Sequence, residues 1–168
     1  MTSIDLFATL GTLYLFAVAW PLSRTDVREH RLPNKYVLPA FPITLAGLFL
    51  SAIFYNHWQQ LLFATIAALV SFVIGLLANR FCSLGMGDVK LIAAMTLSLA
   101  WFSVLSPLIA LVLAFVLASL VILVRLVLGQ AYLHQAIALG PYLLAAFVVT
   151  QMLTWSSCLG GLTPNFLM

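Results

Sequence analysis

The sequence predicts an all-α integral membrane protein, a bundle of about six transmembrane helices. Of the 168 residues, 64% are hydrophobic and only 7% are charged, a balance that soluble globular domains do not reach. Apolar runs of about 20 residues recur, which is the length that a helix needs to cross a hydrocarbon core about 30 Å thick. A membrane β-barrel would show short segments of alternating polarity instead. No linker or repeat divides the chain, so we expect residues 1–168 to form a single polytopic domain.

Charged residues, prolines and polar clusters bound six expected spans. In chain order they are Ile4–Leu22, Tyr36–Tyr55, Gln60–Ala78, Val89–Leu105, Pro107–Leu128 and Ile137–Trp155. We interpret the first as a retained helix rather than a signal peptide, because basic residues follow it and none precedes it. The short link Ser103–Pro107 makes the fourth and fifth spans antiparallel neighbours.

All seven basic residues fall on one side of the expected membrane. They lie in the first connection, on both sides of the third and at the end of the fifth span: Arg24, Arg28, Arg31, Lys35, Arg80, Lys90 and Arg125. The other connections carry none. The positive-inside rule therefore places the odd-numbered connections in the cytoplasm and both termini outside it.

The same topology brings three of the four acidic residues, Asp26, Glu29 and Asp88, to one membrane face. Asp26 follows the first span, and Asp88 immediately precedes the fourth. Taken alone, Asp88 has a plainer interpretation as a helix N-cap after Gly85 and Gly87, and Asp26 as a solvated loop carboxylate among arginines. Together they make a carboxylate pair geometrically possible at the cytoplasmic border.

Three other interpretations of these residues are open: a metal site, an ion pair between Lys90 and Asp88, and a transport function. A metal site built from both Asp residues with His30 and His134 lacks any ligand spacing such as HExxH, so we expect no metal and no cofactor. Lys90 lies two residues after Asp88 and points away from it on a helix, so it would extend to the interface instead of pairing. A small proton- or ion-conducting transporter subunit is the alternative function, since membrane carboxylates often mark ion pathways, although no span interior contains an acid.

Three sequence blocks resemble the type IV prepilin peptidases, membrane aspartyl peptidases that carry a Gly-x-Gly-Asp motif. The blocks are Asp26 with Leu32-Pro33-Asn34, then Gly85-Met86-Gly87-Asp88-Val89-Lys90-Leu91, then Gly140-Pro141-Tyr142-Leu143. Their order and the six-span layout both fit the family, which makes the match more specific than a lone Gly-x-Gly-Asp. One departure is Ala138, where family members often have a second proline.

The resemblance implies an aspartyl endopeptidase in which Asp26 and Asp88 are the catalytic pair that activates water. Gly85, Gly87, Lys90, Pro33, Asn34, Gly140 and Pro141 would be the supporting motif residues. If Asp88 begins a helix, the helix dipole favours its anionic form and hence Asp88 as the base. The implied substrate is a prepilin, whose transmembrane helix lies in the bilayer and whose basic leader is removed at the cytoplasmic border.

The resemblance also implies a location and partners. The protein would be a multi-pass protein of the bacterial cytoplasmic (inner) membrane, in contact with lipid, with its active site facing the cytoplasm. Pilus assembly machinery is a further expected partner, and nucleic acid is not. Larger family members carry an amino-terminal region with paired cysteines that methylates the new pilin terminus. Nothing in this chain corresponds to it, so we expect the short, peptidase-only form of Flp pilus and tight-adherence systems, without methyltransferase activity.

Overall fold

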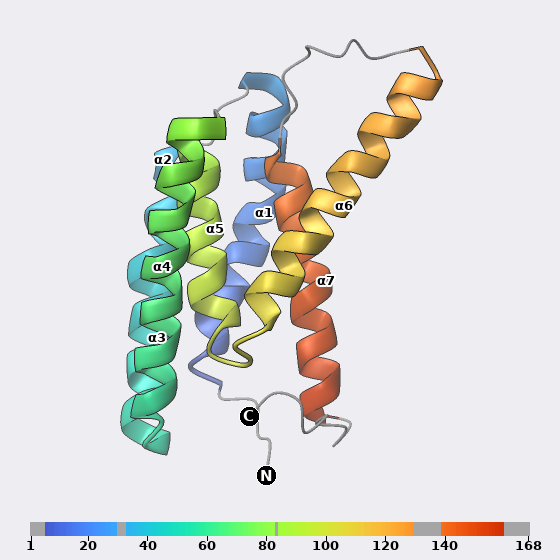
Figure 1. The fold of residues 1–168 in the computed structure, drawn as a ribbon. Helices are drawn as coiled ribbons and strands as arrows, with labels where there is room; N and C mark the ends of the chain where they lie inside the picture. The colour runs from blue at the N-terminus through green and yellow to red at the C-terminus, as the bar shows by residue number, and fades with distance from the viewer. Residues whose placement is uncertain (1–5, 30–32, 83, 130–138, 160–168) are drawn as a thin grey trace.

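The computed structural model describes residues 6–29, 33–82, 84–129 and 139–159. These residues form helices joined by short turns, and no strand occurs among them. The long helices lie side by side in one bundle (Figure 1). In chain order the helices are α1 (Thr9–Glu29), α2 (Asn34–Val37), α3 (Ala40–Tyr55), α4 (Trp58–Cys82), α5 (Met86–Leu99), α6 (Ser106–Val127) and α7 (Gly140–Leu159).

These helices correspond to the six expected spans. The short helix α2 leads into α3 almost without a break, because Leu38 and Pro39 between them keep right-handed helical backbone angles. Within the described residues, three segments are long and apolar enough to cross a membrane: Asn34–Tyr55, Trp58–Phe81 and Ser106–Val127. The prediction of an all-α fold is thus confirmed for the described residues, and three of the six expected spans meet the length and hydropathy that a membrane crossing needs.

The two largest differences from the predicted spans are at the ends of α1 and α5. Helix α1 continues to Glu29, past the expected end at Leu22, so Asp26 is helical and does not lie in a loop. Helix α5 ends at Leu99, short of the expected Leu105. There the N–H groups of Phe102 and Ser103 both donate to the Leu99 carbonyl, and the Leu105 N–H donates to the Ser103 hydroxyl. Serine offers the backbone this alternative to a helix, which a count of apolar residues does not register.

Helix α5 is the central helix of the bundle. It contacts each of the six other helices that the structure describes. Most residues of α5 are buried, and those that are exposed lie mainly in its first turn. The neighbouring helices approach closely through small residues, as is usual in membrane bundles. A side chain at Gly11 of α1 would overlap Thr44 of α3, and one at Gly47 of α3 would overlap the backbone carbonyl of Phe7. Helix α6 packs through a four-residue repeat of small side chains, Ser106, Ala110, Ala114 and Ala118.

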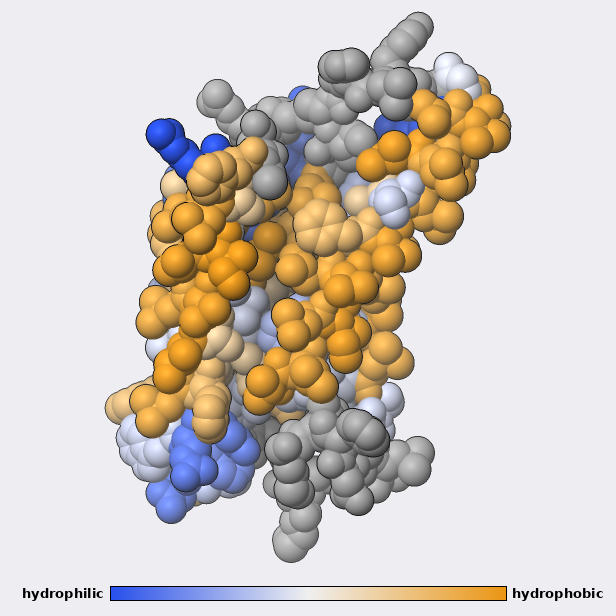
Figure 2. Space-filling view, in the orientation of Figure 1, coloured by the Kyte–Doolittle hydropathy of each residue, from blue (hydrophilic) through white to orange (hydrophobic). Residues whose placement is uncertain are grey.

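The basic residues that the structure describes gather at one end of the bundle, which we call the basic end. They lie in the last turns of α1, α4 and α6, in α2 and in the first turns of α5: Arg24, Arg28, Lys35, Arg80, Lys90 and Arg125. Arg31 lies outside the described residues. On the face shown in Figure 2, hydrophobic residues cover the middle of the bundle and hydrophilic residues lie towards its two ends.

The close approach of α1 and α3 predicts a specific sensitivity at Gly47. Replacing Gly47 with Leu should destabilise the protein by about 1–3 kcal/mol or more, because the new side chain would meet backbone that cannot rotate away. Thermal unfolding in detergent measures the change. The matched control is Ala46→Leu, one residue earlier on the exposed face of the same helix. Equal unfolding temperatures for the two variants would contradict this packing.

Candidate active site

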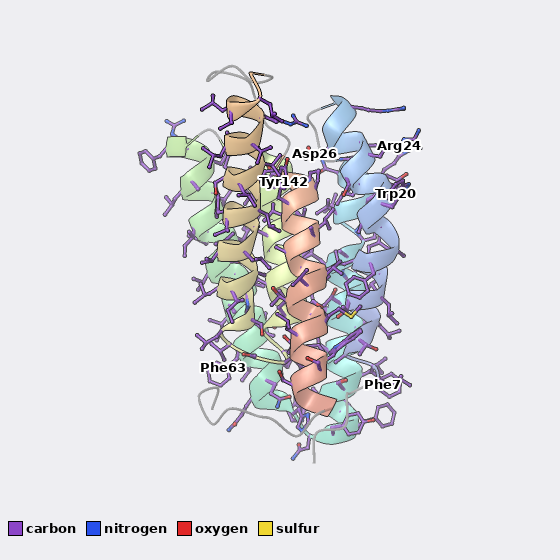
Figure 3. All side chains as sticks on the ribbon, turned by 90° about the vertical axis from the view of Figure 1, so that its right-hand side faces the viewer. Phe7, Trp20, Arg24, Asp26, Phe63 and Tyr142 are labelled. Carbon is purple, nitrogen blue, oxygen red and sulfur yellow. The ribbon has the colours of Figure 1, made fainter. Side chains whose placement is uncertain are left out.

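Asp26 is buried at the basic end, although it belongs to a chain segment rich in arginine. Only 5% of its surface is exposed, so the interpretation as a solvated loop carboxylate is wrong. Asp26 lies in the last turns of α1, and its side chain points into the bundle. Figure 3 shows Asp26 beside the start of α7 and near Tyr142, at the opposite end of the bundle from Phe7 and Phe63. A buried carboxylate needs compensating hydrogen bonds.

The first residue of α7 supplies one such bond. The backbone N–H of Gly140 donates to Oδ2 of Asp26 over 2.8 Å. The N–H groups in the first turn of a helix have no partner within the helix, and the helix dipole is positive there. The start of α7 therefore stabilises negative charge on Asp26. Pro141 follows at a position where its missing N–H removes no helical bond. The first and third sequence blocks thus meet directly at this carboxylate.

Asp88 lies in the first turn of α5, but it is not the N-cap that its local sequence suggests. The N-cap is Gly85, whose backbone is extended, and whose carbonyl accepts the first helical bond from Val89. The Asp88 side chain folds back over this glycine. A Cβ atom at position 85 would lie 2.8 Å from Asp88 Oδ2, closer than real Cβ contacts allow. The glycine therefore makes room for the carboxylate, and Gly87 lies between them in the same turn.

The two carboxylates interact electrostatically. Asp88 precedes the apolar run of α5, and its pKa is raised from 3.8 to about 6, first by burial and then by the negative charge of Asp26. Its Oδ1 atom is buried and has no hydrogen-bond partner among the described residues. Asp26 and Asp88, far apart in sequence, thus lie close enough for the charge of Asp26 to act on the Asp88 carboxyl. One of the two carboxylates is bonded to a helix start, and the other holds a proton more readily than usual.

A second bond joins the first and second sequence blocks. The Lys90 ammonium donates to Oδ1 of Asn34 over 3.0 Å. Asn34 is the first residue of α2, directly after Pro33, whose backbone is extended. Lys90 was expected to extend to the interface instead of pairing with Asp88. Its hydrogen bond goes to Asn34, in agreement with the second part of this expectation. This bond holds α2 against α5 close to Asp88.

Two further residues shape the start of α5 and were missed in the sequence. A side chain at Gly75 of α4 would come within 2.7 Å of Val89 Cγ1, so this glycine lets α4 close upon the turn that carries Asp88. The Asn79 side-chain amide donates to the backbone carbonyl of Leu84, just before the Gly85 cap. A lone amide near the end of a long apolar helix was the signal that could have pointed to Asn79.

The competing metal site would use His30 and His134, which lie outside the described residues. His57 lies in the link between α3 and α4, at the opposite end of the bundle. The described residues contain no group of three or more metal-ligating side chains. The described groups offer two carboxylates in different surroundings, one bonded to a helix start and one with a raised pKa, an arrangement that suits general acid–base catalysis.

Comparison with known proteins gave one match. A profile described as the type IV leader peptidase family matches residues 13–127, which is more than half of the chain and includes both Asp26 and Asp88. Gly140 and Pro141 lie beyond the matched range. No curated protein and no solved structure matches the chain.

The raised pKa of Asp88 predicts a pH-dependent stability difference. In the folded protein Asp88 binds its proton more tightly than the ordinary value of 3.8 allows, so its ionised form costs stability above about pH 6, and the cost vanishes below about pH 4. Asp88→Asn should therefore unfold at a higher temperature than the wild type at pH 7 to 8, and at the same temperature near pH 4.

Thermal unfolding of both proteins across this pH range measures the effect. In an Asp26→Asn background the difference should shrink, since one of its two causes is gone. Arg125→Gln serves as the control for an unrelated change of one charge at the basic end. A difference that stays constant with pH would show that Asp88 is not perturbed.

Proposed function

We propose that this chain, which belongs to the type IV leader peptidase family, hydrolyses the leader of prepilins with Asp26 and Asp88. The observation that carries the proposal is the electrostatic coupling of these two carboxylates, one from the end of α1 and one from the start of α5. Membership of the family implies cleavage of prepilin leaders in general. Our proposal concerns the residues that perform this cleavage and the type of prepilin that is cleaved.

The different surroundings of the two carboxylates support different roles. Asp26, which accepts the Gly140 N–H at the positive end of α7, acts as the base and takes a proton from the attacking water. Asp88, whose pKa is raised, holds its proton up to about pH 6, and in this form it donates a hydrogen bond to the scissile carbonyl oxygen as negative charge develops there. The C–N bond then breaks, and the leaving amine receives a proton from the pair.

This assignment differs from the expectation that the dipole of α5 makes Asp88 the base. Burial and the charge of Asp26 both act against ionisation of Asp88, and they outweigh the dipole, since the resulting pKa lies above the ordinary value. The buried Oδ1 atom of Asp88, without a partner among the described residues, is available to a substrate. A group that ionises late is suited to act as the acid.

The position of the pair fits a substrate that is itself a membrane helix. A peptide bond inside a helix is shielded by its own hydrogen bonds, and glycine weakens a helix by about 1 kcal/mol. A bond next to a glycine at the membrane border is therefore the easiest to extend towards two carboxylates. The basic residues at the same end of the bundle support a cytoplasmic active site and termini on the opposite side. A Flp-type prepilin, cleaved without methylation, is the proposed substrate.

Removing either carboxylate should abolish processing. Asp26→Asn and Asp88→Asn should each lower the rate of leader removal by about 10²- to 10⁴-fold, the usual contribution of a general acid or base. Co-expression with a prepilin, followed on a gel, measures cleavage. Asp5→Asn is the control acid from elsewhere in the sequence. Normal processing by either folded variant would refute the assignment of the pair.

The pair should also give a bell-shaped dependence of kcat/KM on pH. The alkaline limb should fall above about pH 6, where Asp88 loses its proton in the free enzyme, and the acid limb should fall where Asp26 becomes protonated. Rates in detergent at fixed ionic strength test this profile. A chelator should leave them unchanged. Complete inhibition by the chelator, reversed by zinc, would favour the metal site instead.

A further inference from the structure

A groove lies on the face of α5 that is turned away from Asp88. Residues two positions apart on a helix point in nearly opposite directions, so Lys90 and Asp88 face different sides. Lys90, Ala93 and Leu97 form the floor of the groove, and α3 and α4 form its walls. The cavity measures about 280 Å³, and its lining is almost entirely apolar.

The groove continues towards the middle of the bundle. A second cavity of about 340 Å³ lies further along the same two walls and shares Leu45 and Thr65 with the first. Along α3 and the residues just before it, the lining runs from Leu38 to Phe49. At 1.5 Å per residue this is a length of about 16 Å, close to half of a hydrocarbon core about 30 Å thick. The groove therefore has the depth of one leaflet.

The end of the groove nearest the membrane border is positively charged. Lys90 lines it directly, with its ammonium against Asn34 Oδ1. Lys35 of α2 lies one helical turn before Leu38, on the same side of that segment. None of the described residues that line the two cavities is acidic. An apolar slot one leaflet deep, with two lysines at its mouth, combines the two features that recognise an anionic lipid.

We propose that this groove binds one acyl chain of an anionic phospholipid from the leaflet at the basic end, with the lipid phosphate against Lys90 and Lys35. A substrate helix fits this groove less well for two reasons. It would cross the whole bilayer and not one leaflet, and it would lie on the side of α5 away from Asp88. Lipid binding in this groove does not require catalysis, so it can be tested independently of the proposed peptidase activity.

The proposed site would couple lipid binding to the region around Asp88. The bond between Lys90 and Asn34 already joins α5 to α2, and a phosphate shared by the two lysines would add a second link between these helices. The acyl chain would fill the space between α3 and α4, whose mutual contacts are few compared with those of α4 and α5. A bound lipid would therefore brace the four helices on this side of the bundle.

Native mass spectrometry of the full chain in detergent tests the proposal, with phosphatidylglycerol and phosphatidylcholine of identical acyl chains as probes. The wild type should retain one phosphatidylglycerol molecule in preference to phosphatidylcholine. Each lysine near the headgroup should contribute about a fivefold preference. Lys35→Gln should reduce the preference by that factor, and Arg125→Gln, at the same end of the bundle but on α6, should not.

The apolar part of the site has its own variant. Leu45→Trp fills the groove where its two cavities meet and should abolish lipid retention. Leu50→Trp places the same side chain on α3 outside the groove and should leave retention intact. Equal retention of the two lipids by the wild type, or no retained lipid, would overturn the proposal even if Leu45→Trp failed to fold. A photoreactive residue at Leu45 that cross-links a prepilin instead of lipid would overturn it as well.

Discussion

The buried carboxylate of Asp26 is the constraint on which the arrangement of the bundle depends. A carboxylate removed from water costs several kcal/mol unless fixed donors replace its hydration. Its donor, the N–H of Gly140, is 114 positions away in sequence and belongs to the first residue of α7. The end of α1 and the beginning of α7 must therefore lie at one level. Helix α5, packed against both, brings Asp88 to that same level.

Two distinct surfaces follow from the central position of α5. Asp88, Ile92 and Met95 lie along one side, and the latter two pack towards α6 and α7. Lys90, Ala93 and Leu97 lie along the other, in the groove between α3 and α4. The helical period separates these sets cleanly, because positions three and four apart share a face and positions two apart do not. One short helix therefore places the Asp88 carboxylate and the Lys90 ammonium on opposite sides, so that these two polar groups do not compete.

The sequence predicted the features that arise from composition and from the count of charges. Apolar runs identified the helices, and the basic residues indicated that Asp26 and Asp88 share one end of the bundle. It could not predict the bond between Lys90 and Asn34, or that between Asp26 and Gly140, because each depends on the relative height of helices distant in sequence. The early end of α5 was missed for a different reason, namely that local bonds of Ser103 compete with the helix.

Gly47 and Gly85 are both crowded, but the atoms that crowd them differ, and so does the expected effect of a substitution. A side chain at Gly47 would meet the backbone carbonyl of Phe7, just before α1, so the substitution acts on the packing of the helices. A side chain at Gly85 would meet the end of the Asp88 side chain, so the substitution acts on the position of a carboxylate. The same change, the addition of one Cβ atom, therefore disturbs the framework at one glycine and the candidate site at the other.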